Sequence, residues 1–155
     1  MPRPVQCLYD HSLNPTMRQK QEEISITTCG RGLWDITEHV SRWVAASGIR
    51  NGLLTIFIRH TSASLLVQEN YDPEVQRDLE RFFAKLVRDG DAMFEHMSEG
   101  PDDMPAHVRA ALTQTSLSIP VVDGALGLGS WQGLYVYEHR TAGLRRRVLF
   151  HLIGE

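Results

Sequence analysis

The last third of the chain is a succession of short strand-like segments joined by tight turns, and this pattern limits the folds open to the chain. The segments are rich in β-branched and aromatic residues and cover 117–122, 126–128, 134–139 and 147–153. A turn signal at Asp123-Gly124 separates the first two. Strands that follow one another so closely pair antiparallel, because a parallel pair needs a long crossover connection. A doubly wound parallel fold is therefore excluded.

Three helices are predicted ahead of these strands. The first, 35–48, begins with a capping aspartate and has a glycine where it would stop. The second, 72–86, begins with an aspartate cap and a first-turn proline, and the third, 103–112, with an aspartate cap. The second helix carries an apolar stripe that predicts packing against the core, formed by Val75, Leu79, Phe82 and Leu86.

Further strands at 22–27, 53–58 and 63–67 complete the pattern, and the second of these is apolar on both faces, as expected of a central strand. We therefore expect an α+β fold with antiparallel, sandwich-like sheets and helices packed on one side. The 155 residues fit a single domain at 21–155. Residues 1–20 are polar, punctuated by proline and without periodicity, and are predicted to form an N-terminal arm.

Composition excludes several functional classes. A net charge of -3 argues against a dedicated nucleic-acid-binding protein, which needs a broad basic face. No apolar run has the length of a signal peptide or a membrane span, so secretion and membrane insertion are disfavoured. Only two cysteines are present, Cys7 and Cys29, which favours free thiols in a reducing compartment. We expect a cytoplasmic protein.

Three of the seven histidines stand where a polar pocket can form. His60 ends a buried strand and is followed by small residues, His96 lies in a long polar loop at 91–103, and His107 lies in the helix after it. Three imidazoles with one open position are typical of a catalytic zinc site, so zinc is favoured and magnesium, which prefers oxygen ligands, is second. The alternative for each is a surface or hydrogen-bonded histidine. Four carboxylates are candidates to ligate the metal or orient its ligands: Glu69, Asp72, Asp102 and Asp103.

A second group of residues is a candidate for substrate binding. Asn70 has the chemistry to donate to a phosphate or hydroxyl group, or it is simply a turn residue. Asp72 is best explained as a helix cap, with a pocket role for its spare oxygen. The glycine-rich segment 127–133 holds Ser130, Trp131 and Gln132 and brings backbone close to a flat or charged ligand. The alternative for this segment is a bulged corner of the sheet, and the alternative for Trp131 is a place in the core.

Glu138 is the candidate general acid or base, because it stands among apolar residues on a strand. His60 is the second candidate catalytic group. Arg140 is a candidate to bind the substrate, or a partner that makes Glu138 structural. No serine-centred elbow, Cys-x-x-Cys pair or dinucleotide glycine fingerprint is present, which disfavours nucleophilic hydrolases and redox enzymes.

An ordered set of motifs resembles the YjbQ-like family, also called the secondary thiamine-phosphate synthase family. The likeness runs from about Gln19 to the terminal Gly154-Glu155. The motifs are His60-Thr61-Ser62-Ala63, Glu69-Asn70-Tyr71-Asp72-Pro73, Ser116 through Asp123-Gly124, Gly129-Ser130-Trp131-Gln132-Gly133 and Glu138-His139-Arg140. The arm has no recognised counterpart in the family, and the loop 91–103 departs from its usual form.

The resemblance implies an α+β homotrimer with a histidine-lined metal pocket near subunit contacts. It also implies weak thiamine-phosphate synthase activity, in which a pyrimidine pyrophosphate and a thiazole phosphate are joined and pyrophosphate is released. Carried over by position, the metal histidines would be His60, His96 and His107, the pocket groups Asn70, Asp72 and Gln132, and the catalytic carboxylate Glu138.

Sequence and resemblance together lead us to expect a metal-binding enzyme, a transferase acting on a small phosphorylated or anionic molecule. A metal with Arg140 or Arg145 would gather the charge of departing pyrophosphate. A histidine-rich site nevertheless suits zinc better than magnesium. The alternatives are therefore a metal-dependent hydrolase of unknown substrate and a non-catalytic module that binds a metal or metabolite.

Overall fold

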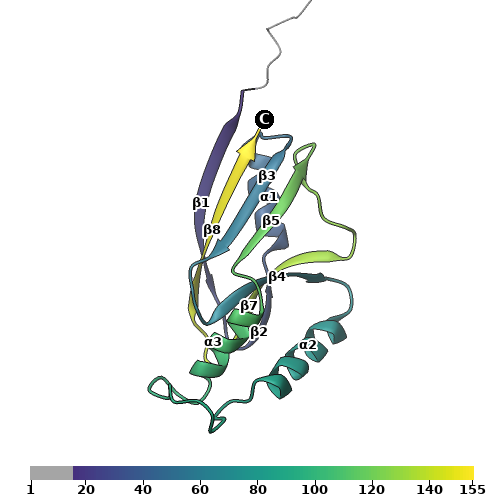
Figure 1. Ribbon diagram of the computed structural model, residues 1–155. Helices are drawn as coiled ribbons and strands as arrows, with labels where there is room; N and C mark the ends of the chain where they lie inside the picture. Colours follow the sequence, from purple (N-terminus) through teal and green to yellow (C-terminus); the bar gives the residue numbers. More distant parts are fainter. Residues whose placement is uncertain (1–15) are drawn as a thin grey trace, which may run out of the picture.

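Two antiparallel sheets form the framework of the computed structural model, which describes residues 16–155 (Figure 1). The larger sheet has the order β1-β8-β3-β5-β6. Its strands are β1 (Arg18–Thr27), β8 (Arg145–Gly154), β3 (Gly52–Ile58), β5 (Ser116–Val122) and β6 (Ala125–Leu126). The smaller sheet has the order β2-β7-β4, with β2 (Gly32–Asp35), β7 (Gln132–Glu138) and β4 (Ala63–Glu69). The predicted α+β class with antiparallel sheets is confirmed.

Three helices accompany the sheets in the described part of the chain: α1 (Thr37–Ser47), α2 (Pro73–Leu86) and α3 (Asp103–Leu112). Figure 1 shows α1 behind the larger sheet, with α2 and α3 at the end where the smaller sheet lies. Among residues 16–155, no helix is long and apolar enough to cross a membrane.

The core lies between the two sheets and α1. In β3, which lies between β8 and β5 as expected of a central strand, Leu54, Ile56 and Ile58 are buried. Leu53 and Phe57, on the opposite side of the same strand, are exposed. The two apolar faces of this central strand therefore have different surroundings, since one packs in the core and the other is exposed on the outer face of the larger sheet.

The predicted aspartate cap is present at α2 and absent at α3. Asp72 caps α2 by accepting a hydrogen bond from the backbone N–H of Glu74 at 2.8 Å. Asp103 was predicted to cap α3, but the helix begins at Asp103, and the preceding residue, Asp102, makes no side-chain capping bond. Both carboxylates have other partners, described below. The cap prediction for Asp103 is therefore wrong.

The apolar stripe of α2 is also not used as predicted. No residue of α2 is buried, and Phe82 and Leu86 are exposed. At the other end of the chain, β1 begins at Arg18, inside the predicted arm, because these residues pair with the end of β8. Residues 1–15 of that arm lie outside the described residues.

A buried ion pair joins the two sheets. Glu138, the last residue of β7, is fully buried and faces Arg146 of β8, which is 3% exposed. The guanidinium donates to both carboxylate oxygens, at 2.6 and 2.5 Å, and also to the carbonyl and hydroxyl oxygens of Ser62. Thr28 and the backbone N–H of Arg140 donate to the same carboxylate, both at 2.9 Å. Every oxygen of Glu138 is thus engaged by the protein itself.

We predict that Glu138→Gln lowers the free energy of unfolding by about 3–5 kcal/mol, because it leaves the buried Arg146 without a counter-charge. Urea denaturation measures the loss. The double variant Glu138→Leu/Arg146→Met should recover part of it. As a control, Glu38→Gln removes an exposed pair with Arg42 and should cost no more than about 1 kcal/mol. Equal losses for Glu138→Gln and this control would contradict a structural role for the buried pair.

Candidate functional site

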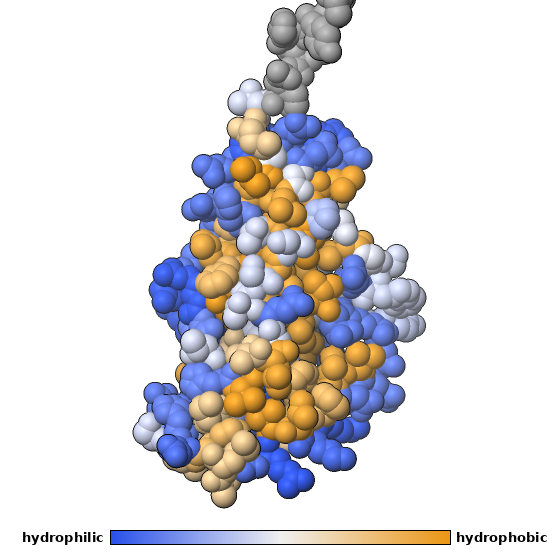
Figure 2. Space-filling view, viewed as in Figure 1, coloured by the Kyte–Doolittle hydropathy of each residue, from blue (hydrophilic) through white to orange (hydrophobic). Residues whose placement is uncertain are grey.

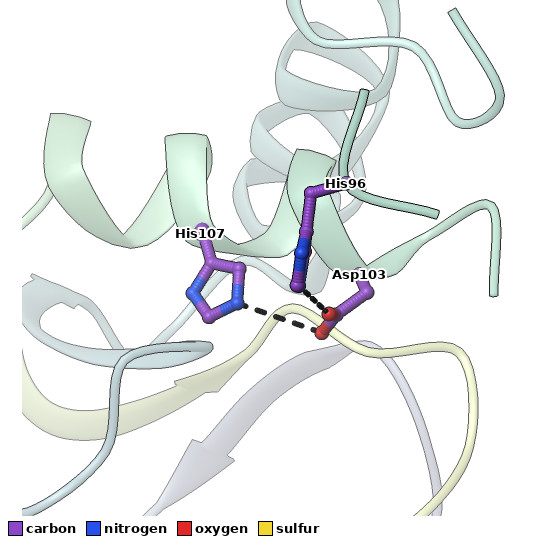
Figure 3. Close-up of side chains that lie close together, drawn as sticks. All are labelled: His96, Asp103 and His107. Carbon is purple, nitrogen blue, oxygen red and sulfur yellow. Dashed lines mark hydrogen bonds and ion pairs between the residues drawn. The ribbon is translucent and has the colours of Figure 1, made fainter. Parts of the chain in front are cut away.

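His96, Asp103 and His107 lie together at one end of the molecule, and one ligand atom from each lies within 4.8 Å of the others (Figure 3). Nε2 of His96 is 2.8 Å from Oδ2 of Asp103, and Nε2 of His107 is 3.7 Å from its Oδ1. Asp103 and His107 are four residues apart on α3, so they share one face of the helix. The preceding loop brings His96 to the same face.

The orientation of His107 favours a ligand role. Its Nδ1 lies 3.0 Å from the carbonyl oxygen of Thr61, and a carbonyl can only accept, so Nδ1 carries the proton. Nε2 then presents its lone pair on the side of Asp103. Metal-binding histidines are commonly fixed in this way by a hydrogen bond at the other ring nitrogen.

Asp103 is held by Arg140, although its side chain is only 3% exposed. Nη1 of Arg140 donates to Oδ1 of Asp103 at 2.6 Å, and Nε donates to Oδ2 of Asp102 at 3.0 Å. Burial opposes ionisation of Asp102, but hydrogen bonds from Thr141 and Arg140 outweigh it and lower its pKa to about 2. The Asp102 carboxylate thus remains charged beside the guanidinium that also holds Asp103.

Arg140 was predicted to bind the substrate. Its remaining terminal nitrogen, Nη2, donates to the carbonyl oxygen of Glu99 at 2.8 Å, so all three of its nitrogens bond to the chain itself. This arrangement favours a positioning role for Arg140, because it holds Asp103 in place beside the two histidines.

His60 lies outside this cluster. Its Nε2 accepts a hydrogen bond from the backbone N–H of Arg147 at 2.7 Å. Burial, assisted by the nearby charges of Arg146 and Arg147, lowers the pKa of His60, so its ring is neutral at pH 7. His60 and His107 line the same pocket, of about 280 Å³. The third candidate ligand in the cluster is therefore Asp103, in the place that the sequence assigned to His60.

The candidate substrate-binding residues lie at the other end of the smaller sheet. In the pairing of β4 with β7, Ala63 faces Glu138 and Glu69 faces Gln132. The two ends are six residues apart, or about 20 Å at 3.3 Å per residue. Asn70 bonds to the backbone at this far end, where its N–H donates to the carbonyl oxygen of Trp131 at 3.0 Å. Within one chain, these residues do not share a cavity with the histidine cluster.

The side chains at this far end are largely exposed. Trp131 is 58% exposed and packs edge-on against Tyr71, with ring centroids 4.8 Å apart, so it is not a core residue. Gln132 accepts from the N–H of Gly129 at 2.8 Å, and Ser130 between them is exposed. Asp72 serves as the helix cap. Substrate binding by these residues stays a prediction.

A serine–histidine pair that the sequence did not suggest lies inside the fold. Oγ of Ser64 is 2.9 Å from Nε2 of His139, and both residues are fully buried. Burial, with a contribution from the charge of Arg109, lowers the pKa of His139 to about 3, so the ring is neutral. Because no ligand reaches fully buried groups, the pair is part of the packing and not a nucleophile with its base.

The donor set of the cluster fits a zinc-like ion. Two imidazoles and one carboxylate, with a further position open, are a known catalytic zinc pattern. Bonds of about 2.1 Å in a tetrahedral site separate ligand atoms by about 3.4 Å. In the cluster, one ligand atom from each residue lies within 4.8 Å of the others, and each histidine lies beside a different oxygen of Asp103, at 2.8 and 3.7 Å. The sequence signal for Asp103 was its spacing of four residues from His107.

Comparison with known proteins identifies a family. A family model described as UPF0047 protein YjbQ-like matches residues 22–155. A UPF0047 protein from Synechocystis sp. is 50% identical over 90% of this chain and 95% of its own length. The UPF0047 protein YjbQ of Escherichia coli O157:H7 is 40% identical over 87% of this chain and 98% of its own length.

Solved structures agree with this similarity. A crystal structure from Sulfolobus solfataricus, described as YbjQ-like and of unknown function, has a TM-score of 0.82 at 25% identity and covers 90% of this chain and 100% of that one. An uncharacterised conserved protein of the yjbq/upf0047 family from Clostridium acetobutylicum has a TM-score of 0.78 at 32% identity and covers 84% of this chain and 98% of that one.

These comparisons correct the expected function. The relatives carry a family name without a reaction, and the Sulfolobus protein is described as of unknown function. Within one chain, Arg140 has no nitrogen left unbonded to gather pyrophosphate, and Asn70 and Gln132 lie far from the histidines. The prediction of a metal-dependent thiamine-phosphate synthase acting on a phosphorylated substrate is therefore wrong. The chain belongs to the YjbQ-like UPF0047 family, and that membership identifies its fold and no reaction.

Proposed function

We propose that His96, Asp103 and His107 bind a divalent metal ion, with zinc favoured by the ligand types and magnesium second. The observation that carries the proposal is the convergence of three ligand atoms within 4.8 Å of one another. Two of the three are already fixed by other groups, since Thr61 orients His107 and Arg140 holds Asp103.

The proposed role is that of an enzyme whose ligand is a small anionic molecule. When bound, a divalent ion supplies Lewis-acid chemistry at its open coordination positions. The chain's own residues prepare the site. His107 presents the lone pair of Nε2, and Asp103 supplies a carboxylate whose orientation is fixed by its hydrogen bond from Arg140. His96 is 47% exposed, so the cluster is accessible from solvent.

We predict that His107→Ala, His96→Ala and Asp103→Asn each weaken zinc binding by at least about 100-fold. Losing a partner that only orients a ligand costs about 10–100-fold, and losing the ligand itself costs more. Isothermal titration of the metal-free protein with zinc measures the change. His39→Ala, which removes an exposed histidine of α1, is the matched control and should leave affinity unchanged. A wild-type protein without zinc affinity would contradict the proposal, as would three variants that bind like the wild type.

We further propose a homotrimer, as the family resemblance implies. The structural support is α2, which is strongly amphipathic but has no buried residue. Phe82 is 60% and Leu86 is 56% exposed. Figure 2 shows hydrophobic side chains gathered on the part of the surface where α2 and α3 lie. A second copy of the chain is the proposed cover, because an apolar stripe of this kind is stabilised by burial against a partner.

The homotrimer predicts a mass three times that of the chain, measured by light scattering coupled to size-exclusion chromatography. The double variant Phe82→Glu/Leu86→Glu should shift the protein to monomer, because it places charge in an apolar contact. Arg77→Glu, a change of charge on an exposed residue of the same helix, should leave the mass unchanged. A monomeric wild type would overturn the proposed assembly.

A further inference from the structure

The pocket shared by His60 and His107 has the features of a small-molecule site. It has a volume of about 280 Å³ and is lined by His60, Thr61, His107, Ala110, Ala111 and Thr115. The lining comes from the end of β3, from one face of α3 and from the turn that follows α3. Ligand cavities commonly range from about 300 to 1,000 Å³, so this one suits a ligand of few atoms.

Three hydrogen-bonding side chains of the pocket are free to meet a ligand. Nε2 of His60 accepts from Arg147, so the proton of this neutral ring is on Nδ1. Among residues 16–155, Nδ1 of His60 has no hydrogen-bond partner. The hydroxyl groups of Thr61 and Thr115 likewise make no hydrogen bond within the described chain. The pocket therefore offers one imidazole N–H and two hydroxyl groups.

The charges beside His60 favour an anion. Arg59 and Arg147 share a single carboxylate, that of Glu23, at 2.5 and 3.9 Å respectively. One positive charge is thus in excess in this group beside His60, while on the α3 side Asp102 and Asp103 share the single guanidinium of Arg140. Arg146 is neutralised by Glu138 and adds nothing to the excess.

The part of the pocket wall that α3 supplies also includes small apolar side chains. Ala110 and Ala111 follow His107 by three and four residues on α3, so all three lie on the same face of the helix. Their methyl groups leave room that larger side chains would fill. A ligand that bonds to the donors and also packs against the two alanines has an anionic head and a short hydrocarbon tail.

We propose that this pocket binds a short-chain aliphatic carboxylate, with its carboxylate at His60 and the two threonines and its tail on Ala110 and Ala111. The proposal deepens the proposed function by naming the class of the anionic ligand. The carboxylate proposal rests on the proposed function only in taking the ligand to be an anion. The groups that would hold the carboxylate are the side chains of the pocket, so the metal ion is not needed for binding.

Butyrate is the probe, titrated into ¹⁵N-labelled full-length protein and followed by amide chemical shifts of the pocket residues. Each methylene added from acetate to butyrate should strengthen binding about fourfold, since one buried methylene contributes about that factor. Butyramide, which has the same tail without the charge, should bind at least about tenfold more weakly. Inorganic phosphate should bind no better than acetate, because it has no tail.

Two variants test the assignment to this pocket. His60→Ala removes the donor and should weaken butyrate binding at least about tenfold. Ala111→Leu fills the pocket from an exposed helical position and should abolish binding without disturbing the fold. Ala45→Leu, at an exposed position of α1, is the matched control and should bind like the wild type.

Equal binding of butyrate and butyramide, or full butyrate binding by Ala111→Leu, would overturn the inference. The titration is repeated with a chelator, where butyrate binding should persist. A protein that binds butyrate but no zinc would contradict only the proposed cation site. A protein that binds zinc but no butyrate would contradict only the carboxylate pocket.

Discussion

The ion pair between Glu138 and Arg146 is the interaction on which the rest of the structure depends. It joins the last residue of β7 in the smaller sheet to β8 in the larger one, in the absence of solvent. The same carboxylate accepts from the backbone N–H of Arg140, and Arg140 in turn holds Asp103 beside the two histidines. The polar contacts that fix the relation of the sheets therefore continue directly into the candidate metal centre.

Local pattern was sufficient for most of the fold. The cap at Asp72, the central strand β3 and the closely spaced strands β5, β7 and β8 follow from residues next to one another in the sequence. The exposed stripe of α2 could not be predicted, because an apolar helix face looks the same whether it meets the chain's own core or a partner. The short strand β2 was missed because its four residues form a strand only by pairing with β7.

In the candidate site, too, residue types and local placement were predictable, whereas contacts between distant segments were not. His96 and His107 were predicted as metal ligands from residue type and placement, and the fold brings them together. Asp103 was predicted to cap the third helix and was also one of four carboxylates named as candidates to ligate the metal or orient its ligands. Its contact with Arg140, which lies 37 residues away, could not be predicted from local pattern. Asn70 and Gln132 were assigned to the same pocket, but the strand register that separates them from the histidines depends on pairing between distant segments.

The central claim is that two imidazoles and one carboxylate hold a single cation, and X-ray absorption spectroscopy of the zinc-loaded protein tests it most directly. We predict a first shell with two imidazole nitrogens near about 2.0 Å and carboxylate oxygen at about 2.0–2.2 Å, with the outer-ring scattering that is characteristic of histidine. A first shell of oxygen atoms alone, without imidazole scattering, would contradict the claim.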